Sequence, residues 1–392
     1  MSLDLRAHFS HFLNADPDRL HLAAHSHHFW PDVARAAQLD MYDDAARLAD
    51  RKWGLILGEI LPQVQAATAS ILNLPDPNTI AVAPNTHDFV KRLLSCLPAG
   101  RPPRILTTDC EFHSFARQIA RLEEEGLVSV TRIEAEPFDS FAENFTAAAG
   151  LGGWDMVFLS QVFFNSGASS GDIAALVAAV PDDETLIVID GYHGYMALPT
   201  DLSGLADRIF YLAGGYKYAM GGEGACFLHC PPGYGPRPRD TGWYAAFGAL
   251  EGKQQGVPYA PDGRRFLGAT FDASGLYRQR AVHRWLAEIG LSVEAIHAHV
   301  LACQRAFLDA LGTRNLPGLG RADLLTPLPA DGRHGHFLTF RGPHSAAIHH
   351  ALMAKGIITD LRDDRLRFGF GCYHRLEDMA EAVERISAAW SG

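Results

Sequence analysis

Two reactive side chains, Asp190 and Lys217, each follow an apolar run in this sequence. Residues 186–189 lead directly into Asp190, and residues 208–212 lead through Ala-Gly-Gly-Tyr into Lys217. Such runs are typical of buried strands in a parallel sheet, whose carboxyl ends share one edge where ligands bind. A lysine amine can hold an aldehyde covalently, and a carboxylate can keep a pyridine nitrogen protonated. The pair predicts a site for a cofactor that carries both an aldehyde and a pyridine nitrogen and that withdraws electrons from a bound substrate.

Each of these residues has a simpler interpretation when taken alone. A strand-end aspartate commonly caps a helix or a turn, and a single lysine is commonly solvated. Their order, followed by Gly221, Gly222 and Gly224, makes the paired interpretation more specific. A strand at 79–83 that enters a helix through Asn85-Thr86-His87 offers free N–H groups to a phosphate, although a plain helix cap would give the same pattern.

The elements that must position these residues can be read from the pattern of apolar residues. Seven short strands are expected at 79–83, 104–108, 129–133, 156–160, 186–189, 208–212 and 225–229. Amphipathic helices are expected between them at 88–97, 114–125 and 172–179. This alternation predicts an α/β fold with a mostly parallel seven-stranded sheet that is covered by helices.

The flanking segments predict a second, smaller layer. Helical patterns cover 31–74, with a break or restart at Pro62, and 274–311; residues 231–272 read as a long loop region. From His334 the order is strand, helix, strand, helix. We expect an N-terminal segment at 1–30, a large domain at 31–272 and a small α/β C-terminal domain at 273–392, with which the N-terminal helices could pack.

Composition narrows the classes of partner. The 392 residues carry a formal net charge of −11, which disfavours nucleic acid and anionic membranes as partners. The six cysteines form no CxxC pair, as expected for reduced thiols in a cytoplasmic protein. His25, His27 and His28 have no acidic or thiolate residue nearby in sequence, so no metal site is predicted. A small molecule is the expected partner.

Several motifs, in the same order along the chain, resemble those of the class V aminotransferase superfamily. They include Asp190-Gly-Tyr-His193, Gly215-Tyr-Lys-Tyr218 with its following glycines, and Ser160-Gln-Val-Phe-Phe-Asn-Ser-Gly167. Glu111-Phe-His-Ser114 and Gly356-Ile-Ile-Thr-Asp-Leu-Arg-Asp-Asp-Arg-Leu-Arg-Phe-Gly369 complete the set. The combination is most similar to kynureninase. The resemblance implies fold type I, with pyridoxal 5′-phosphate (PLP) as the cofactor.

The resemblance also implies roles for individual residues. Lys217 would bind the cofactor aldehyde and carry the substrate Cα proton, with Asp190 at the pyridine nitrogen and Tyr216 beside them in the catalytic group. The remaining cofactor contacts would come from Thr86, the backbone of His87, Phe112, Ser160, His193 and Trp243. Thr270 would come from the partner subunit of a homodimer with shared active sites. Arg367 would clamp the substrate carboxylate, as a bidentate guanidinium can.

The segment beside the substrate side chain departs from the family. Kynureninases have Gly-Asn-Ser-Leu-Gly where residues 24–28 are Ala-His-Ser-His-His, so that only Ser26 is retained as a candidate substrate contact. The sequence therefore does not indicate which side chain the substrate carries.

Three functions remain open at this point. The first is hydrolytic Cβ–Cγ cleavage of an amino acid, as in kynureninase. The second is amino-group transfer to a keto acid, as in a class V aminotransferase. The third is an inactive PLP-fold binding protein, which the presence of both Lys217 and Asp190 disfavours. A cysteine desulfurase is also disfavoured, because no cysteine stands between 334 and 366.

Overall fold

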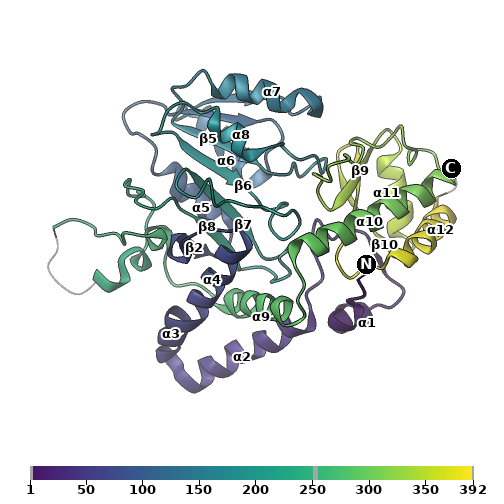
Figure 1. Cartoon of the computed structure of the whole chain (residues 1–392), viewed down its shortest axis with the longest axis horizontal. Coiled ribbons are helices and arrows are strands. Elements are labelled where there is room, and N and C mark those ends of the chain that lie inside the picture. Colours follow the sequence, from purple (N-terminus) through teal and green to yellow (C-terminus); the bar gives the residue numbers. More distant parts are fainter. Residues whose placement is uncertain (1–2, 250–254, 391–392) are drawn as a thin grey trace.

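Seven strands form one sheet in the large part of the molecule. The computed structural model describes residues 3–249 and 255–390 (Figure 1). The strand order is β2 (Ile80–Ala83), β8 (Cys226–His229), β7 (Ile209–Gly214), β6 (Leu186–Asp190), β5 (Met156–Ser160), β3 (Arg104–Thr108) and β4 (Ser129–Ile133). Strand β8 is antiparallel to both of its neighbours, and the other pairs are parallel. The predicted mostly parallel seven-stranded sheet is confirmed.

Both faces of the sheet are covered. In β6, Ile187 and Ile189 face one apolar core, whereas Leu186 and Val188 face the other, because successive side chains of a strand point to opposite sides. Helices α5 (Thr86–Leu94) and α6 (His113–Glu124) pack in the second core. Helices α7 (Phe138–Ala149) and α8 (Ile173–Ala178) pack in the first. Of these helices, only α7 has no counterpart among the predictions.

The N-terminal helical region has a break at Ala49 that was not predicted. Helix α2 (Asp32–Leu48) ends at Ala49, whose φ is 52°. Beyond it, α3 (Lys52–Leu55), a π-helical turn (Ile56–Ile60) and α4 (Leu61–Ile71) follow one another directly. Pro62 lies in the first turn of α4, directly after the π-helical turn, in which the Leu61 N–H donates to the carbonyl oxygen of Ile56. The chain is not broken at Pro62, but the α-helix restarts there after the π-helical turn, which is the second of the two predicted outcomes.

A sharp corner divides the helical region that was predicted at 274–311. Helices α9 (Ser274–Glu288) and α10 (Val293–Gly312) meet at 87°. Gly290, with φ at 64°, lies in the corner and takes a conformation that costs glycine little. Within the described ranges no single helix is long and apolar enough to cross a membrane; only this bent pair, taken together, passes by length and composition.

The C-terminal layer lies at the far end of α10 (Figure 1). Strands β11 (Asp360–Arg362), β12 (Arg365–Gly369) and β9 (Phe337–Arg341) form an antiparallel sheet with α11 (Ser345–Met353) and α12 (Met379–Ala389) nearby. The N-terminal strand β1 (Leu20–His21) pairs with β10 (Ile357–Ile358), and helix α1 (Ser10–Asn14) precedes it. Helix α2 packs against α9, which lies within the predicted 273–392 domain. The domain boundaries stay a proposal.

Candidate active site

Lys217 and Asp190 lie at the carboxyl ends of two adjacent strands. Asp190 is the last residue of β6, and Lys217 follows the end of β7 by three residues. The Lys217 Nζ atom is 2.5 Å from His193 Nε2. It also lies 5.4 Å from the centre of the Phe112 ring and 5.7 Å from that of Tyr216. Four residues predicted for the site therefore lie near one buried amine, that of Lys217.

The electrostatics of this cluster suit carbonyl chemistry. Burial, together with the charge of Arg367, lowers the pKa of Lys217 to about 7, so that much of the amine is neutral near neutral pH. Burial raises the pKa of Asp190 to about 6, against the opposing effect of Lys217. Burial also lowers the pKa of His193, with a further contribution from Lys217. A neutral amine can add to an aldehyde, and a buried carboxylate is poised to pair with a cationic ring nitrogen.

The start of helix α5 borders the same region. Thr86 is its first residue, and the Asn85 side chain caps the helix by accepting a hydrogen bond from the Asp88 N–H at 3.0 Å. Cys226 of β8 lies beside Ala83, which leads into α5, and beside Gly214, which leads to Lys217, so that both segments meet at this edge of the sheet. His87 Nδ1 is 3.3 Å from the carbonyl oxygen of Ser114 on α6. The helix start could hold a phosphate as predicted.

Ser160 is held by a buried acid that was not assigned a role from the sequence. Its hydroxyl donates to Glu111 Oε2 at 2.6 Å, and its backbone N–H donates to Glu111 Oε1 at 3.2 Å. Thr108 donates to the same carboxylate at 2.7 Å. Ser160 is also the parallel neighbour of Asp190 between β5 and β6. Glu111 thus joins two strand ends beside the site and leaves lone pairs of the Ser160 oxygen free to accept hydrogen bonds.

The burial of Glu111 can be tested by measuring how the stability of the protein depends on pH. Burial raises the pKa of Glu111 from 4.5 to about 7, despite the hydrogen bonds from Ser160 and Thr108. The folded protein holds the carboxyl proton of Glu111 more tightly than the unfolded chain does. The resulting stabilisation is fully present below the unfolded pKa of Glu111 and is lost as the pH rises to about 7. In the wild type, the unfolding free energy should therefore fall by at most about 3 kcal/mol over this pH range. In Glu111→Gln this fall should be absent.

The measurement for Glu111→Gln is urea unfolding at several pH values between 4 and 8. Glu125→Gln is the matched control, because Glu125 is exposed and pairs with Arg121 on the surface. If the wild type and Glu111→Gln show parallel pH profiles, Glu111 is not the buried proton-holding group described above.

Arg367 is buried, but it already has partners. Only 3% of the residue is exposed, and it lies in the middle of β12. Its Nη2 donates to Asp360 Oδ2 at 2.5 Å, and its Nη1 donates to the carbonyl oxygen of Phe164. Burial lowers the pKa of Arg367 to about 10, while Asp360 opposes that effect. The guanidinium is therefore held in place, and a substrate carboxylate would have to share or replace Asp360.

The structure does not bring the other three predicted residues to Lys217. Trp243 is 43% exposed and stacks on Tyr244 with ring centres 4.2 Å apart. Thr270 is exposed at the surface. Ser26 lines a separate pocket of about 410 Å³, together with Asp360 and Arg362. These positions leave the predicted roles of Trp243, Thr270 and Ser26 as proposals.

Asp360 and His25 join the site although no role was predicted for them. His25 is fully buried, stacks on Phe337 with ring centres 4.7 Å apart, and its Nε2 is 3.5 Å from Asp360 Oδ2. Burial raises the pKa of Asp360, but His25 and Arg367 outweigh burial and hold it well below its usual range. The position of Asp360 within the Gly356–Gly369 motif is the one sequence signal that points to it. Among the described residues, no group of three or more His, Cys, Asp or Glu is placed to hold a metal ion.

Comparisons with known proteins agree with this geometry. Residues 296–386 match the family model of the kynureninase C-terminal domain. Kynureninases of Burkholderia mallei and Burkholderia pseudomallei are 30% identical to the chain over 227 residues, 55% of this chain and 51% of theirs. Over these regions the chain is similar to kynureninases. The match spans about half the length of these curated relatives.

Solved structures show the same overall fold. A mutant of C-DES, described with glycine covalently linked to its PLP cofactor, superposes with a TM-score of 0.80 at 20% identity, covering 98% of this chain and 99% of its own. The cysteine desulfurase of Thermococcus onnurineus NA1 has a TM-score of 0.76 at 16% identity, covering 97% and 96%. The predicted PLP-transferase-like α/β fold is confirmed.

Proposed function

We propose that the chain is a PLP-dependent enzyme that acts on an amino acid by hydrolytic Cβ–Cγ cleavage. The observation that carries PLP dependence is the buried amine of Lys217, with its pKa at about 7, beside a buried Asp190 at the strand ends. Phe112 and the start of α5 supply a ring face and phosphate donors in the same place. The donor set fits PLP, and the relationship to kynureninases supports the type of bond cleaved.

The residues have separate tasks in this proposal. PLP, when bound, supplies an electron sink for negative charge that develops at the substrate Cα. Lys217 Nζ holds the aldehyde carbon and then carries the Cα proton, Asp190 keeps the ring nitrogen protonated, and Arg367 orients the α-carboxylate. Water supplies a hydroxyl to the γ-carbonyl carbon and a proton to Cβ, so that the acyl group leaves as a carboxylic acid and alanine remains.

Cleavage at sulfur is the main competing function, because cysteine desulfurases and a cystine C–S lyase share the fold. A desulfurase needs a thiolate that can reach the substrate. Cys372 is 1% exposed, burial raises the pKa of its thiol to about 12, and the thiol contacts Met220 Sδ at 3.7 Å. This environment favours an inert, structural cysteine. Amino-group transfer remains the second alternative, since it uses the same cofactor contacts.

A product assay separates these functions. The holoenzyme would be incubated with kynurenine, cysteine, cystine and other amino acids, each with and without an α-keto acid, and the products identified by mass spectrometry. Alanine and an acid from a γ-keto amino acid, formed without a keto acid, would support the proposal. Products that appear only with a keto acid would indicate an aminotransferase, and persulfide or sulfide would indicate cleavage at sulfur.

Asp190→Asn is expected to keep the cofactor and lose most of its activity, at least about tenfold. An amide cannot favour the protonated ring nitrogen, so that the electron sink weakens while the rest of the site stays in place. Absorbance would measure cofactor content, and steady-state kinetics would measure turnover. Near-normal turnover would show that Asp190 has a structural role only; its Oδ1 accepts a hydrogen bond from the Tyr192 N–H at 2.9 Å.

A homodimer with shared active sites is expected as well. Trp243 and Thr270 are exposed on the 231–272 region of this chain, where residues offered to a partner subunit would lie. Sedimentation equilibrium should give the mass of two chains. A fully active monomer would contradict the shared site. We also propose a cytoplasmic location, because all six cysteines are free thiols.

A further inference from the structure

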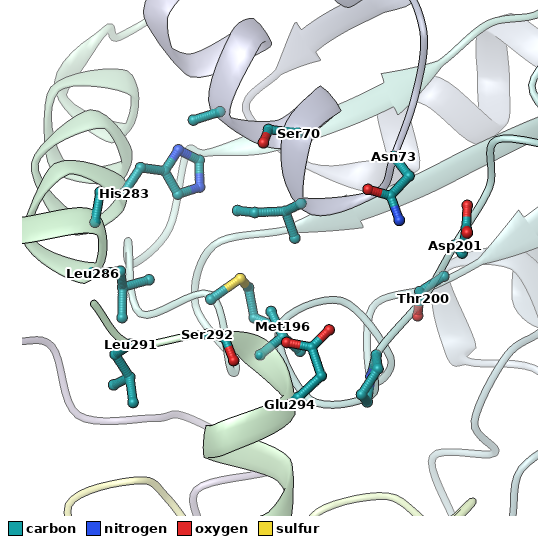
Figure 2. Close-up of a pocket in the computed structure, with 15 residues that line it drawn as sticks. Ser70, Asn73, Met196, Thr200, Asp201, His283, Leu286, Leu291, Ser292 and Glu294 are labelled. Carbon is teal, nitrogen blue, oxygen red and sulfur yellow. The ribbon is translucent and has the colours of Figure 1, made fainter. Parts of the chain in front are cut away.

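A pocket that Lys217 does not line lies at the corner between α9 and α10. Its volume is about 660 Å³, within the range of small-molecule sites. Figure 2 shows His283 and Leu286 on one side, Asn73 and Asp201 on the other, and Met196 between them. The walls come from the end of α4, the 196–201 loop and the α9–α10 corner.

The lining defines the chemistry of a ligand. Eight of the lining residues are apolar and form most of the surface: Ala67, Ile71, Met196, Pro199, Leu286, Ala287, Leu291 and Val293. Two carboxylates, Asp201 and Glu294, stand at the exposed rim, and among the described lining residues there is no lysine or arginine. His283 adds no positive charge, because burial lowers its pKa to about 4. An organic cation with an apolar body would complement this surface.

His283 also connects the pocket to the Lys217 site. Its Nε2 is 2.9 Å from Gln279 Nε2 and 3.2 Å from the Tyr195 hydroxyl. Gln279 donates a second hydrogen bond to the carbonyl oxygen of Ala219, two residues beyond Lys217, and Tyr195 stands two residues beyond His193. A ligand packed against His283 would therefore restrain both the segment that carries Tyr195 and the segment that carries Lys217.

We propose that this pocket binds a small organic cation with an apolar body, and that its occupancy restrains the Lys217 segment through His283, Gln279 and Tyr195. This site is separate from the proposed catalytic site and does not depend on the reaction assigned to it. A ligand of this kind would act on the enzyme from outside the active site, as an effector.

The binding test uses three probes that share a benzyl body. They are benzyltrimethylammonium, benzyl alcohol and phenylacetate, and the quaternary cation has no N–H that could add to an aldehyde at Lys217. Calorimetry on the holoenzyme should give the tightest binding for the cation, about threefold to tenfold tighter than for the alcohol, and the weakest for the anion. Equal affinity for all three probes, or no binding of the cation, would overturn the proposal.

Variants locate the bound cation. Asp201→Asn with Glu294→Gln should remove the preference for the cation and leave the affinity for benzyl alcohol unchanged, because both residues lie at the exposed rim. Ser70→Trp, on the exposed end of α4, should block all three probes by filling the pocket. Undiminished cation binding in either variant would place the cation elsewhere. A change of oligomeric state in Ser70→Trp would make this face a subunit interface and would also overturn the proposal.

Hydrogen exchange tests the connection to Lys217. Saturating benzyltrimethylammonium should slow amide exchange in the peptide that spans residues 213–222, and Tyr195→Phe should reduce that protection at least twofold while keeping the probe bound. Unchanged exchange in this peptide at saturation would refute the coupling. The measurement works with or without turnover, so that its outcome is independent of the proposed reaction.

Discussion

The Lys217→Ala protein is expected to lose at least about a thousandfold in activity toward any amino acid. One amine is assigned two tasks, since it holds the cofactor aldehyde and carries the Cα proton, and proton transfer alone contributes about 10²–10⁴-fold. The visible absorption band of bound PLP should also disappear or shift to that of the free aldehyde. Borohydride reduction of the wild type followed by peptide mapping should place the pyridoxyl group on Lys217.

Lys91→Ala is the matched control for this variant. Lys91 lies on α5, near the proposed phosphate donors, but its side chain is half exposed and pairs with Asp240 at 3.7 Å. It should keep both the absorption band and the activity. A pyridoxyl group on Lys91 or on any lysine other than Lys217 would refute the assignment of the whole site.

Arg367→Ala should reduce kcat/KM by tenfold to a thousandfold or more without loss of bound cofactor. Truncating a buried guanidinium that clamps a carboxylate costs about 2–5 kcal/mol, against less than about 1 kcal/mol for an exposed ion pair. The loss should appear with any α-amino acid substrate, because the carboxylate is common to all of them. Steady-state kinetics and the absorption spectrum measure the two effects.

Arg362→Ala provides the control, because both arginines bond to the same aspartate. Arg362 Nη1 is 2.9 Å from Asp360 Oδ1, but the Arg362 side chain is 44% exposed whereas that of Arg367 is 4% exposed. We expect Arg362→Ala to change kcat/KM by less than about fivefold. The opposite order of effects would move the carboxylate clamp from Arg367 to Arg362. Thermal unfolding of both variants is needed as well, because Arg367→Ala removes the buried arginine that pairs with Asp360.

The pattern of apolar residues in the sequence was sufficient to predict the central sheet. Each of its seven strands is a short run rich in apolar or β-branched residues, and this pattern is local information. Asp190 and Lys217 could be placed at one edge for the same reason, since parallel strands end on the same side. The corner at residues 289–292 was not predicted, because α9 and α10 are both apolar enough to read as one helix and only packing sets their angle.

The partners of the site residues were decided by the tertiary structure. Sequence alone placed Arg367 in a candidate clamp, but the contacts of Arg367 with Asp360 and Phe164 depend on the folding of β12 beside β11 and the 160–167 turn. Glu111 was visible only as part of a motif, and its hydrogen bonds to Ser160 arise because β3 and β5 are neighbours in the sheet. Such pairings join residues that are distant in the chain, and the apolar pattern of one strand carries no information about its neighbour.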